Sequence, residues 1–256
     1  MPYFDYNATT PPHPAALVAA HETAGQAWHN PSSPYRAAAR AHALLEESRE
    51  QFASLLGGHA QNYVFTSGAT EANNAVFAHF ARNAAAHARV IISAIEHPSV
   101  LESAHYYFPS RTKLLRADHN GVAQVDKLDA ELQTGDVALV SLLAANNETG
   151  VLQPWAEAAK ICRARGVPFH CDATQWLGKL PAQALLACDY VTGSAHKFGG
   201  LKGAGFLKIP TGANLHVQYG GEQEHGHRAG TENLPAIRAM LAALQARIAG
   251  LESQML

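Results

Sequence analysis

The chain has 256 residues, 47% of them hydrophobic, which is enough for one large α/β domain or two small ones around a sizeable core. Its formal net charge is −2 and no block of like charges occurs, which argues against nucleic acid or an anionic membrane surface as the main partner. The three cysteines follow no disulfide or zinc spacing, so we expect free thiols and no metal site. Without a signal-peptide pattern or an evident run of membrane-spanning length, a cytoplasmic protein with no membrane partner is the default expectation.

Apolar runs and helix-forming stretches alternate along the chain. The runs predict strands at 63–65, 90–92, 112–116, 137–143, 167–171, 190–192 and 205–209. Start and stop signals predict helices at 14–26, 35–56, 71–87, 99–107, 125–133, 155–165, near 181–186, and from 234 onward. This alternation predicts an α/β fold, a mostly parallel mixed sheet flanked by helices on both faces, with ligands at the carboxyl ends of the strands.

The segment 66–70 joins the first predicted strand to a helix. Gly68 and Ala69 are small and leave the first amide N–H groups of that helix open, and the hydroxyl of Thr70 lies beside them. Such a helix start favours an anion, best a phosphate. An ordinary helix start capped by Ser or Thr is the alternative.

Lys197 stands between the predicted strand at 190–192 and a glycine-rich loop at 199–205. An amine held there can lose solvation, which lowers its pKa and makes it a nucleophile that condenses with the carbonyl group of a cofactor. For this residue alone, a surface lysine at a strand end is the alternative.

Four further polar residues follow strand ends. His97 could stack on an aromatic ring and act as acid or base, or simply bond to the backbone of its loop. Asn147 could hydrogen-bond a ligand, or it could simply be one of the residues that form a turn. Asp172 needs a cationic partner, which a pyridinium nitrogen would supply, while Gln175 could reach the phenolic oxygen of the same ring. An N-cap aspartate is the alternative for Asp172.

Each of these features is weak alone, but together they describe one pocket. A phosphate seat, a stacking histidine, a strand-end aspartate and a glycine-flanked lysine occur in that order along the chain. These are the groups that pyridoxal 5′-phosphate (PLP) needs from a protein. The sequence therefore predicts PLP as the cofactor.

The sequence also resembles the cysteine desulfurases, in the class V branch of the fold-type I PLP enzymes. The matching segments follow the family order and are 5–10, 30–33, 65–74, 96–100, 146–150, 170–175, 193–200 and 228–233. The resemblance implies that L-cysteine is converted to L-alanine, and that enzyme-bound persulfide sulfur is passed on for iron–sulfur cluster or thio-cofactor assembly. It also implies a sulfur-acceptor or scaffold protein as a partner.

The resemblance assigns roles to the matched residues. Lys197 would bind the cofactor and shuttle the α-proton of the substrate, and His97 would stack on the ring and assist this transfer. Asp172 would bind the pyridine nitrogen. Asn147 and Gln175 would contact the phenolic oxygen, and Asn147 also the substrate.

The resemblance further implies a shared phosphate site. Thr70, Ser194 and His196 would hold the phosphate of the chain's own cofactor. A threonine matching Thr231 reaches the phosphate of the neighbouring subunit in the family, which implies a homodimer.

Family members extend beyond the matched part, with most of a small domain, a mobile-loop cysteine that accepts the sulfur and an arginine that binds the substrate carboxylate. We therefore expect an arm at 1–14 that would join the small domain, a PLP-binding large domain at 15–233, and a helix at 234–256 leading towards a small domain that is largely absent. None of the three cysteines fits the loop role. Cys171 lies beside Asp172, but a strand cysteine is more often inert core.

We expect PLP to bind at Lys197 and the sulfur-transfer step to be impaired. Two alternatives remain open. One is another class V enzyme, such as a selenocysteine lyase or an aminotransferase. The other is a non-catalytic relative that acts as a binding partner.

Overall fold

The computed structural model describes residues 2–133 and 135–255; Met1 and Leu256, at the outer ends of the predicted arm and last helix, lie outside these ranges. The helices are α1 (Pro14–Gln26), α2 (Arg36–Leu56), α3 (Ala69–Asn83), α4 (Pro98–Tyr107), α5 (Leu128–Gln133), α6 (Trp155–Arg165) and α7 (Leu234–Met255). The strands are β1 (Tyr63–Thr66), β2 (Arg89–Ser93), β3 (Thr112–Leu115), β4 (Val137–Ser141), β5 (Phe169–Asp172), β6 (Tyr190–Ser194) and β7 (Gly205–Lys208).

The described strands form one mixed sheet in the order β1-β7-β6-β5-β4-β2-β3. The strands from β6 through β3 in this order are paired in parallel, and β7 is antiparallel to both β1 and β6. The predicted α/β fold with a mostly parallel sheet is therefore confirmed. Because parallel strands end at the same edge, the polar residues that follow β2, β4, β5 and β6 are brought to one side of the sheet.

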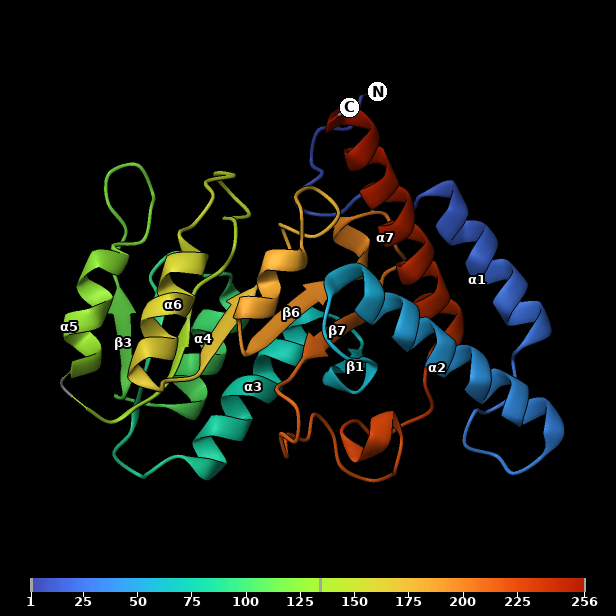
Figure 1. Cartoon of the computed structure of the whole chain (residues 1–256), viewed down its shortest axis with the longest axis horizontal. Helices are drawn as coiled ribbons and strands as arrows, with labels where there is room; N and C mark the ends of the chain where they lie inside the picture. Colours follow the sequence, from blue (N-terminus) through green and yellow to red (C-terminus); the bar gives the residue numbers. More distant parts are fainter. Residues whose placement is uncertain (1, 134, 256) are drawn as a thin grey trace.

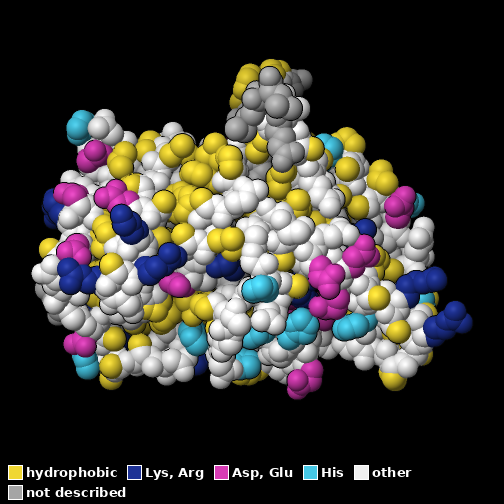
Figure 2. Space-filling view, viewed as in Figure 1, with side chains coloured by type: hydrophobic (Ala, Val, Ile, Leu, Met, Phe, Trp, Pro, Cys, Tyr) yellow, Lys and Arg dark blue, Asp and Glu magenta, His cyan; other side chains and the backbone are white. Residues whose placement is uncertain are grey.

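Both faces of the sheet are covered by helices. Along β2, Val90 and Ile92 pack against α3 and α4 on one face, whereas Ile91 belongs to the core formed with α2, α6 and α7 on the other. This alternation follows from the two-residue period of a strand. Figure 1 shows α1, α2 and α7 gathered at the β1 end of the sheet and α5 at the β3 end. On the face drawn in Figure 2, Lys and Arg side chains are dispersed among acidic and apolar ones.

Several element ends differ from the prediction. The helix predicted at 71–87 is α3, which begins earlier and ends at Asn83, whose side-chain amide donates to the carbonyl of His79 and closes the last turn. The helix predicted at 125–133 begins as a 3₁₀ turn before α5. The strand predicted at 137–143 ends at Ser141, and the amide of Leu143 donates to the buried carboxyl of Glu96.

The last helix corrects one expectation from the sequence. The window Leu234–Leu251 has a mean hydropathy of 1.2, and by length and composition alone this helix could cross a membrane. In the fold it packs on α1 and α2, with Ile237, Met240 and Leu244 at most 3% exposed. Its apolar composition is therefore explained by burial in the core of a globular domain.

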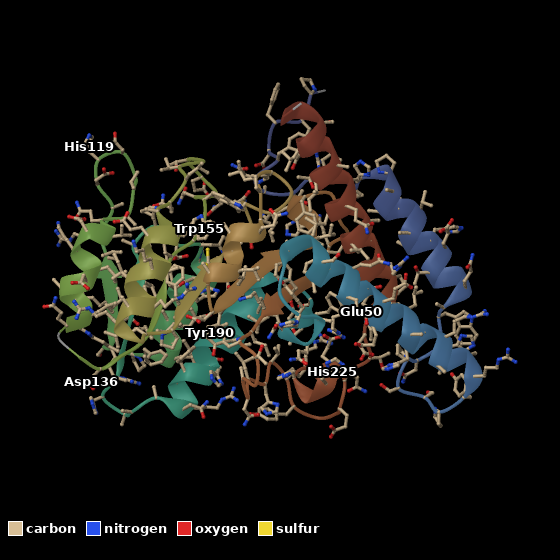
Figure 3. All side chains as sticks on the ribbon, in the orientation of Figure 1. Glu50, His119, Asp136, Trp155, Tyr190 and His225 are labelled. Atoms are coloured by element: carbon tan, nitrogen blue, oxygen red, sulfur yellow. The ribbon has the colours of Figure 1, made fainter. Side chains whose placement is uncertain are left out.

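A buried ion pair fixes the segment between β7 and α7. The guanidinium of Arg49 donates to both carboxylate oxygens of Glu224, at 2.6 and 2.9 Å, and both side chains are 1% exposed. Glu224 also accepts from the amide of Phe65 at 2.6 Å. Glu224 and His225 have φ values of 51° and 54°, in the left-handed region that residues with side chains disfavour. The ion pair of Arg49 and Glu224 must therefore hold this strained stretch of backbone in place. Figure 3 labels His225 at the lower edge of the view.

Arg49→Met leaves the carboxylate of Glu224 buried without a cation. We expect the free energy of unfolding, measured by urea denaturation, to fall by about 3–5 kcal/mol. Adding Glu224→Gln removes the stranded charge and keeps an acceptor for the amide of Phe65, so the double variant should recover part of the loss. Arg49→Met with wild-type stability would contradict the role of this pair.

Candidate active site

A cavity of about 230 Å³ lies at the carboxyl ends of the parallel strands. It is slightly smaller than the pockets of roughly 300–1,000 Å³ that commonly take small ligands. Most of the residues singled out from the sequence line it, namely Ala69, Thr70, His97, Asn147, Asp172, Gln175, Ser194, His196 and Lys197. Gly68 adjoins the cavity as the N-cap of α3, whereas Thr231 lies elsewhere. The topology thus brings together residues up to 128 positions apart in the chain.

Lys197 is held at the end of a single 3₁₀ turn that follows β6. Tyr190, labelled in Figure 3, begins this strand, so the amine lies beyond its opposite end. The amine donates to the carbonyls of Asn7 and Ala8, at 2.6 and 2.8 Å. Burial lowers the pKa of Lys197, and the carboxylate of Asp172 acts in the opposite direction. The amine and the carboxylate line one cavity, as a planar cofactor between them requires.

Asp172 ends β5 and is 6% exposed. One carboxylate oxygen accepts from the side-chain amide of Asn73 at 2.9 Å, and the other accepts from the backbone amide of Thr174 at 3.0 Å. No helix follows β5 directly, so Asp172 is not an N-cap residue, which was the structural alternative; the second bond is instead a turn contact two residues on. It fixes the carboxylate at the wall of the cavity.

His97 is the N-cap of α4 and is half-buried. Its Nδ1 accepts from the backbone amide of Ser99 at 3.1 Å and lies 2.8 Å from the hydroxyl of the same serine. Because Nδ1 accepts a backbone hydrogen bond, the proton of the neutral ring is on Nε2. The alternative, a histidine bonded to the backbone of its loop, is therefore correct for Nδ1, whereas Nε2 remains available to the cavity.

The N-terminus of α3 has the features of an anion site. Within the described residues, no acceptor bonds the amides of Ala69 and Thr70, the first two of this helix. A Cβ on Gly205 would lie 2.5 Å from the Cα of Gly68, so glycine is required where β7 meets the helix start. This close approach brings the helix N-terminus beside Ser194, whose Oγ would lie 3.2 Å from a Cβ on Gly68. A phosphate fits these groups.

The two predicted amides differ in their partners. Asn147 donates to Glu148 at 2.6 Å, and the turn in this loop is made by Asn146, whose side-chain oxygen accepts from two backbone amides. Asn147 is therefore part of the turn through its backbone, but its side chain makes neither of these turn bonds. Gln175 donates to the carbonyl of Asn7 at 2.8 Å and accepts from Lys179.

The N-terminal arm is bound to the loop that carries the lysine, which the sequence did not reveal. Thr10 donates to the carbonyl of His196 through its amide and its hydroxyl, both at 2.9 Å, and Nδ1 of His196 lies 3.0 Å from the hydroxyl of Thr9. Burial, together with Lys197 and Lys202, lowers the pKa of His196. The arm therefore anchors the residues that carry the lysine as well as leading into α1.

Other lining residues were also missed, namely Ser99, Leu143, Ala145 and Thr174. Ser99 and Thr174 lie two residues after predicted site residues, and that proximity was the available signal. Leu143 and Ala145 continue an apolar run, so the sequence predicted core positions for them.

Thr231 is exposed in a second cavity, which Ser67 and Arg228 also line. It does not join the first cavity, and its action on a second subunit stays a prediction. The thiols of Cys162, Cys171 and Cys188 are free and at most 1% exposed. Burial raises the pKa of Cys162 to about 12 and that of Cys171 well above its ordinary value.

The chain belongs to the class-V aminotransferase family, because the family model described as "Aminotransferase class-V" matches residues 2–253. It is a homologue of cysteine desulfurases. The cysteine desulfurase IscS of Dictyoglomus turgidum is 35% identical over 257 residues, covering 98% of this chain and 65% of that relative. The chain therefore spans just under two-thirds of the length of this curated relative.

Solved structures agree with this assignment. One titled "NIFS-LIKE PROTEIN" has a TM-score of 0.92 and 34% identity, over 98% of this chain and 70% of that one. Another, titled "SspA in complex with cysteine", has a TM-score of 0.90 and 28% identity, over 96% of this chain and 72% of that one.

Lys179 gives an independent probe of the charge in this region. Burial and the charges of Lys197 and Arg247 lower the pKa of Lys179 to about 8. We expect acylation by dilute acetic anhydride, followed peptide by peptide by mass spectrometry, to reach half its maximal rate at Lys179 near pH 8, against about 10.4 for a free lysine. Lys197→Met removes one of these two charges and should raise this midpoint, whereas Lys160→Met, on the exposed side of α6, should not. A midpoint near pH 10 in the unaltered protein would contradict the charge arrangement.

Proposed function

We propose that this chain binds PLP and provides the catalytic large domain of a cysteine desulfurase, which takes sulfur from L-cysteine and leaves L-alanine. The observation that carries the proposal is the single cavity lined by an amine of lowered pKa, a buried strand-end carboxylate and an open helix N-terminus. The similarity to cysteine desulfurases, and to a protein solved with cysteine, supports this substrate.

The residues of the cavity fit the parts of PLP. The amides of Ala69 and Thr70, with Ser194 and His196, would hold the phosphate. Asp172 would hold the pyridine nitrogen. When bound, PLP supplies a carbonyl group that condenses with amines and a ring that accepts electrons.

The chain's own groups would then move and hold protons. The amine of Lys197 would take the proton from Cα of the substrate, because its lowered pKa makes the neutral form accessible. The carboxylate of Asp172 would keep a proton on the ring nitrogen, which favours loss of the α-proton. His97 would lie against the ring with its Nε2–H available to the cavity. Asn147 and Gln175 would contact the phenolic oxygen.

PLP added to the apo protein should give a visible absorption band that free PLP does not show, because the amine of Lys197 condenses with its carbonyl. Borohydride treatment followed by peptide mass spectrometry should place the fixed cofactor on the peptide with Lys197. Lys197→Ala should abolish both signals, whereas Lys202→Ala, an exposed lysine of the next loop, should keep them. A label on another lysine would overturn the assignment.

Sulfur transfer needs a thiolate that the cysteines of this chain do not offer, since all three are buried and the thiols of Cys162 and Cys171 have raised pKa values. We propose that an outside thiol accepts the sulfur. The thiolate attacks the substrate sulfur, a sulfur–sulfur bond forms and the carbon–sulfur bond breaks. One thiol and one cysteine thus give one persulfide and one alanine.

In D₂O, NMR should show Lys197-dependent exchange of the α-proton of cysteine even without added thiol. Alanine release should be slow at a low concentration of cysteine, which is itself a thiol that can accept sulfur, and should rise when a small thiol is added in excess. Replacing Cys162, Cys171 and Cys188 together by Ala should leave both results unchanged if the variant folds. Rapid alanine release without added thiol, lost in that triple variant, would contradict the proposal.

The rival functions differ in substrate. Turnover of selenocysteine but not cysteine would indicate a selenocysteine lyase, and amino-group transfer to a keto acid would indicate an aminotransferase. A folded protein that fails to bind PLP would favour a non-catalytic binding partner. We further propose a homodimer in a reducing, cytoplasmic environment, supported by the exposed Thr231 and the free thiols.

A further inference from the structure

A fully buried asparagine connects two of the proposed cofactor-binding residues. Asn73 lies on α3, and its side chain is 0% exposed. Its Nδ2 donates to Asp172 and to the hydroxyl of Ser99, both at 2.9 Å. Its Oδ1 accepts from the hydroxyl of Thr192 at 2.6 Å. The amide thus makes three side-chain contacts, each to a different element around the cavity floor.

The direction of each bond follows from the chemistry of the groups. An ionised carboxylate only accepts, so the NH₂ of Asn73 must face Asp172 and the amide oxygen must face Thr192. The two amide hydrogens are then divided between Asp172 and Ser99. The hydroxyl of Ser99, which accepts one of them, has its own hydrogen free to donate to Nδ1 of His97 at 2.8 Å. The side-chain amide of Asn73 is therefore linked directly to Asp172 and, through Ser99, to His97.

Hydrogen bonds continue from Asn73 through Thr192 into the core of the domain. Because Thr192 gives its only hydroxyl hydrogen to Asn73, it must accept from Nε2 of His170 at 3.2 Å. Burial lowers the pKa of His170 to about 4, so its ring is neutral and Nδ1 accepts from Ser141 at 2.9 Å. Thr192, His170 and Ser141 are each at most 1% exposed. A rotated Asn73 amide would set its oxygen against the carboxylate of Asp172 and leave the hydroxyl hydrogen of Thr192 without its acceptor.

We propose that Asn73 is a positioning residue that holds the carboxylate of Asp172 and the ring of His97 in one fixed relation, through its two amide hydrogens. This inference rests on the proposed function, because it concerns the residues that would bind the ring nitrogen and stack on the ring. Asn73 does not line the cavity and acts through its neighbours. Without it, the carboxylate would lose a charge-assisted hydrogen bond and the histidine would lose the group that orients Ser99.

The test uses PLP labelled with ¹⁵N in the ring and protein labelled with ¹⁵N in histidine. In the unaltered protein, NMR should show a protonated ring nitrogen and a His97 with its proton on Nε2. In Asn73→Ala, the ring-nitrogen signal should move towards the unprotonated position, and PLP affinity should fall about tenfold or more, as expected for a lost hydrogen bond to a charged group. Asn83→Ala, on the exposed end of the same helix, should change neither.

Three further variants separate positioning from packing. Ser99→Ala should alter the His97 signal and leave the ring nitrogen protonated, because it breaks only one branch. Asn73→Leu keeps nearly the side-chain size but donates no hydrogen bond, so it should behave like Asn73→Ala; wild-type signals there would show a packing role and overturn the proposal. Should Asn73→Ala not fold, Thr192→Val, which keeps the side-chain shape, still decides: the ring-nitrogen signal should shift part of the way, and no shift would refute the proposal.

The proposed function and this inference fail differently. If the unaltered protein binds no PLP, the proposed function fails. The ¹⁵N chemical shift of Nδ1 of His97 in the apo protein, compared between wild type, Asn73→Ala and Ser99→Ala, still reports on the contact with the hydroxyl of Ser99. If PLP binds and the ring nitrogen of Asn73→Ala stays protonated with unchanged affinity, the positioning role of Asn73 fails alone.

Discussion

A carboxylate buried at the end of a parallel strand must be partnered, and much of the site follows from how this fold partners Asp172. The backbone of Thr174 and the amide of Asn73 each bond one of its oxygens, and burial leaves it 6% exposed. These bonds come from the turn after β5 and from α3, which packs on β6 and β7. The carboxylate therefore ties the turn after β5 to α3 beside the cavity.

Contacts between residues far apart in the chain also hold the N-terminal arm and the segment between β7 and α7 in place. Carbonyls of Asn7 and Ala8 hold the amine of Lys197, so the arm must be in place for the lysine to have its observed position. On the other side, the buried pair of Arg49 and Glu224 ties α2 to the strained segment that carries Thr231. Both contacts join residues more than 170 positions apart, so the position of Lys197 and the second cavity each depend on distant parts of the chain.

The sequence predicted what local patterns encode. The apolar runs predicted the strands, and the placement of Lys197 and Asp172 at the ends of β6 and β5 brought them to one edge, as parallel pairing requires. It did not predict the arm against the lysine, because a backbone carbonyl carries no residue-type signal. It also missed Asn73, since a polar residue inside a helix usually faces solvent, and only the packing of α3 on β6 buries it completely.

Two residues also show that a structural role and a chemical role need not compete. The alternative for His97 was a backbone-bonded loop histidine, and its Nδ1 is indeed bonded to the amide of Ser99. The alternative for Asp172 was an N-cap aspartate; no helix begins there, but one of its oxygens accepts from the turn amide of Thr174. In each case the bond to the backbone sets the orientation of the ring or carboxylate, while Nε2 of His97 takes no part in that bond and the second oxygen of Asp172 accepts from Asn73. Local capping chemistry thus supplies the rigidity that a binding group needs, because a side chain fixed at one end loses little further freedom when a ligand arrives.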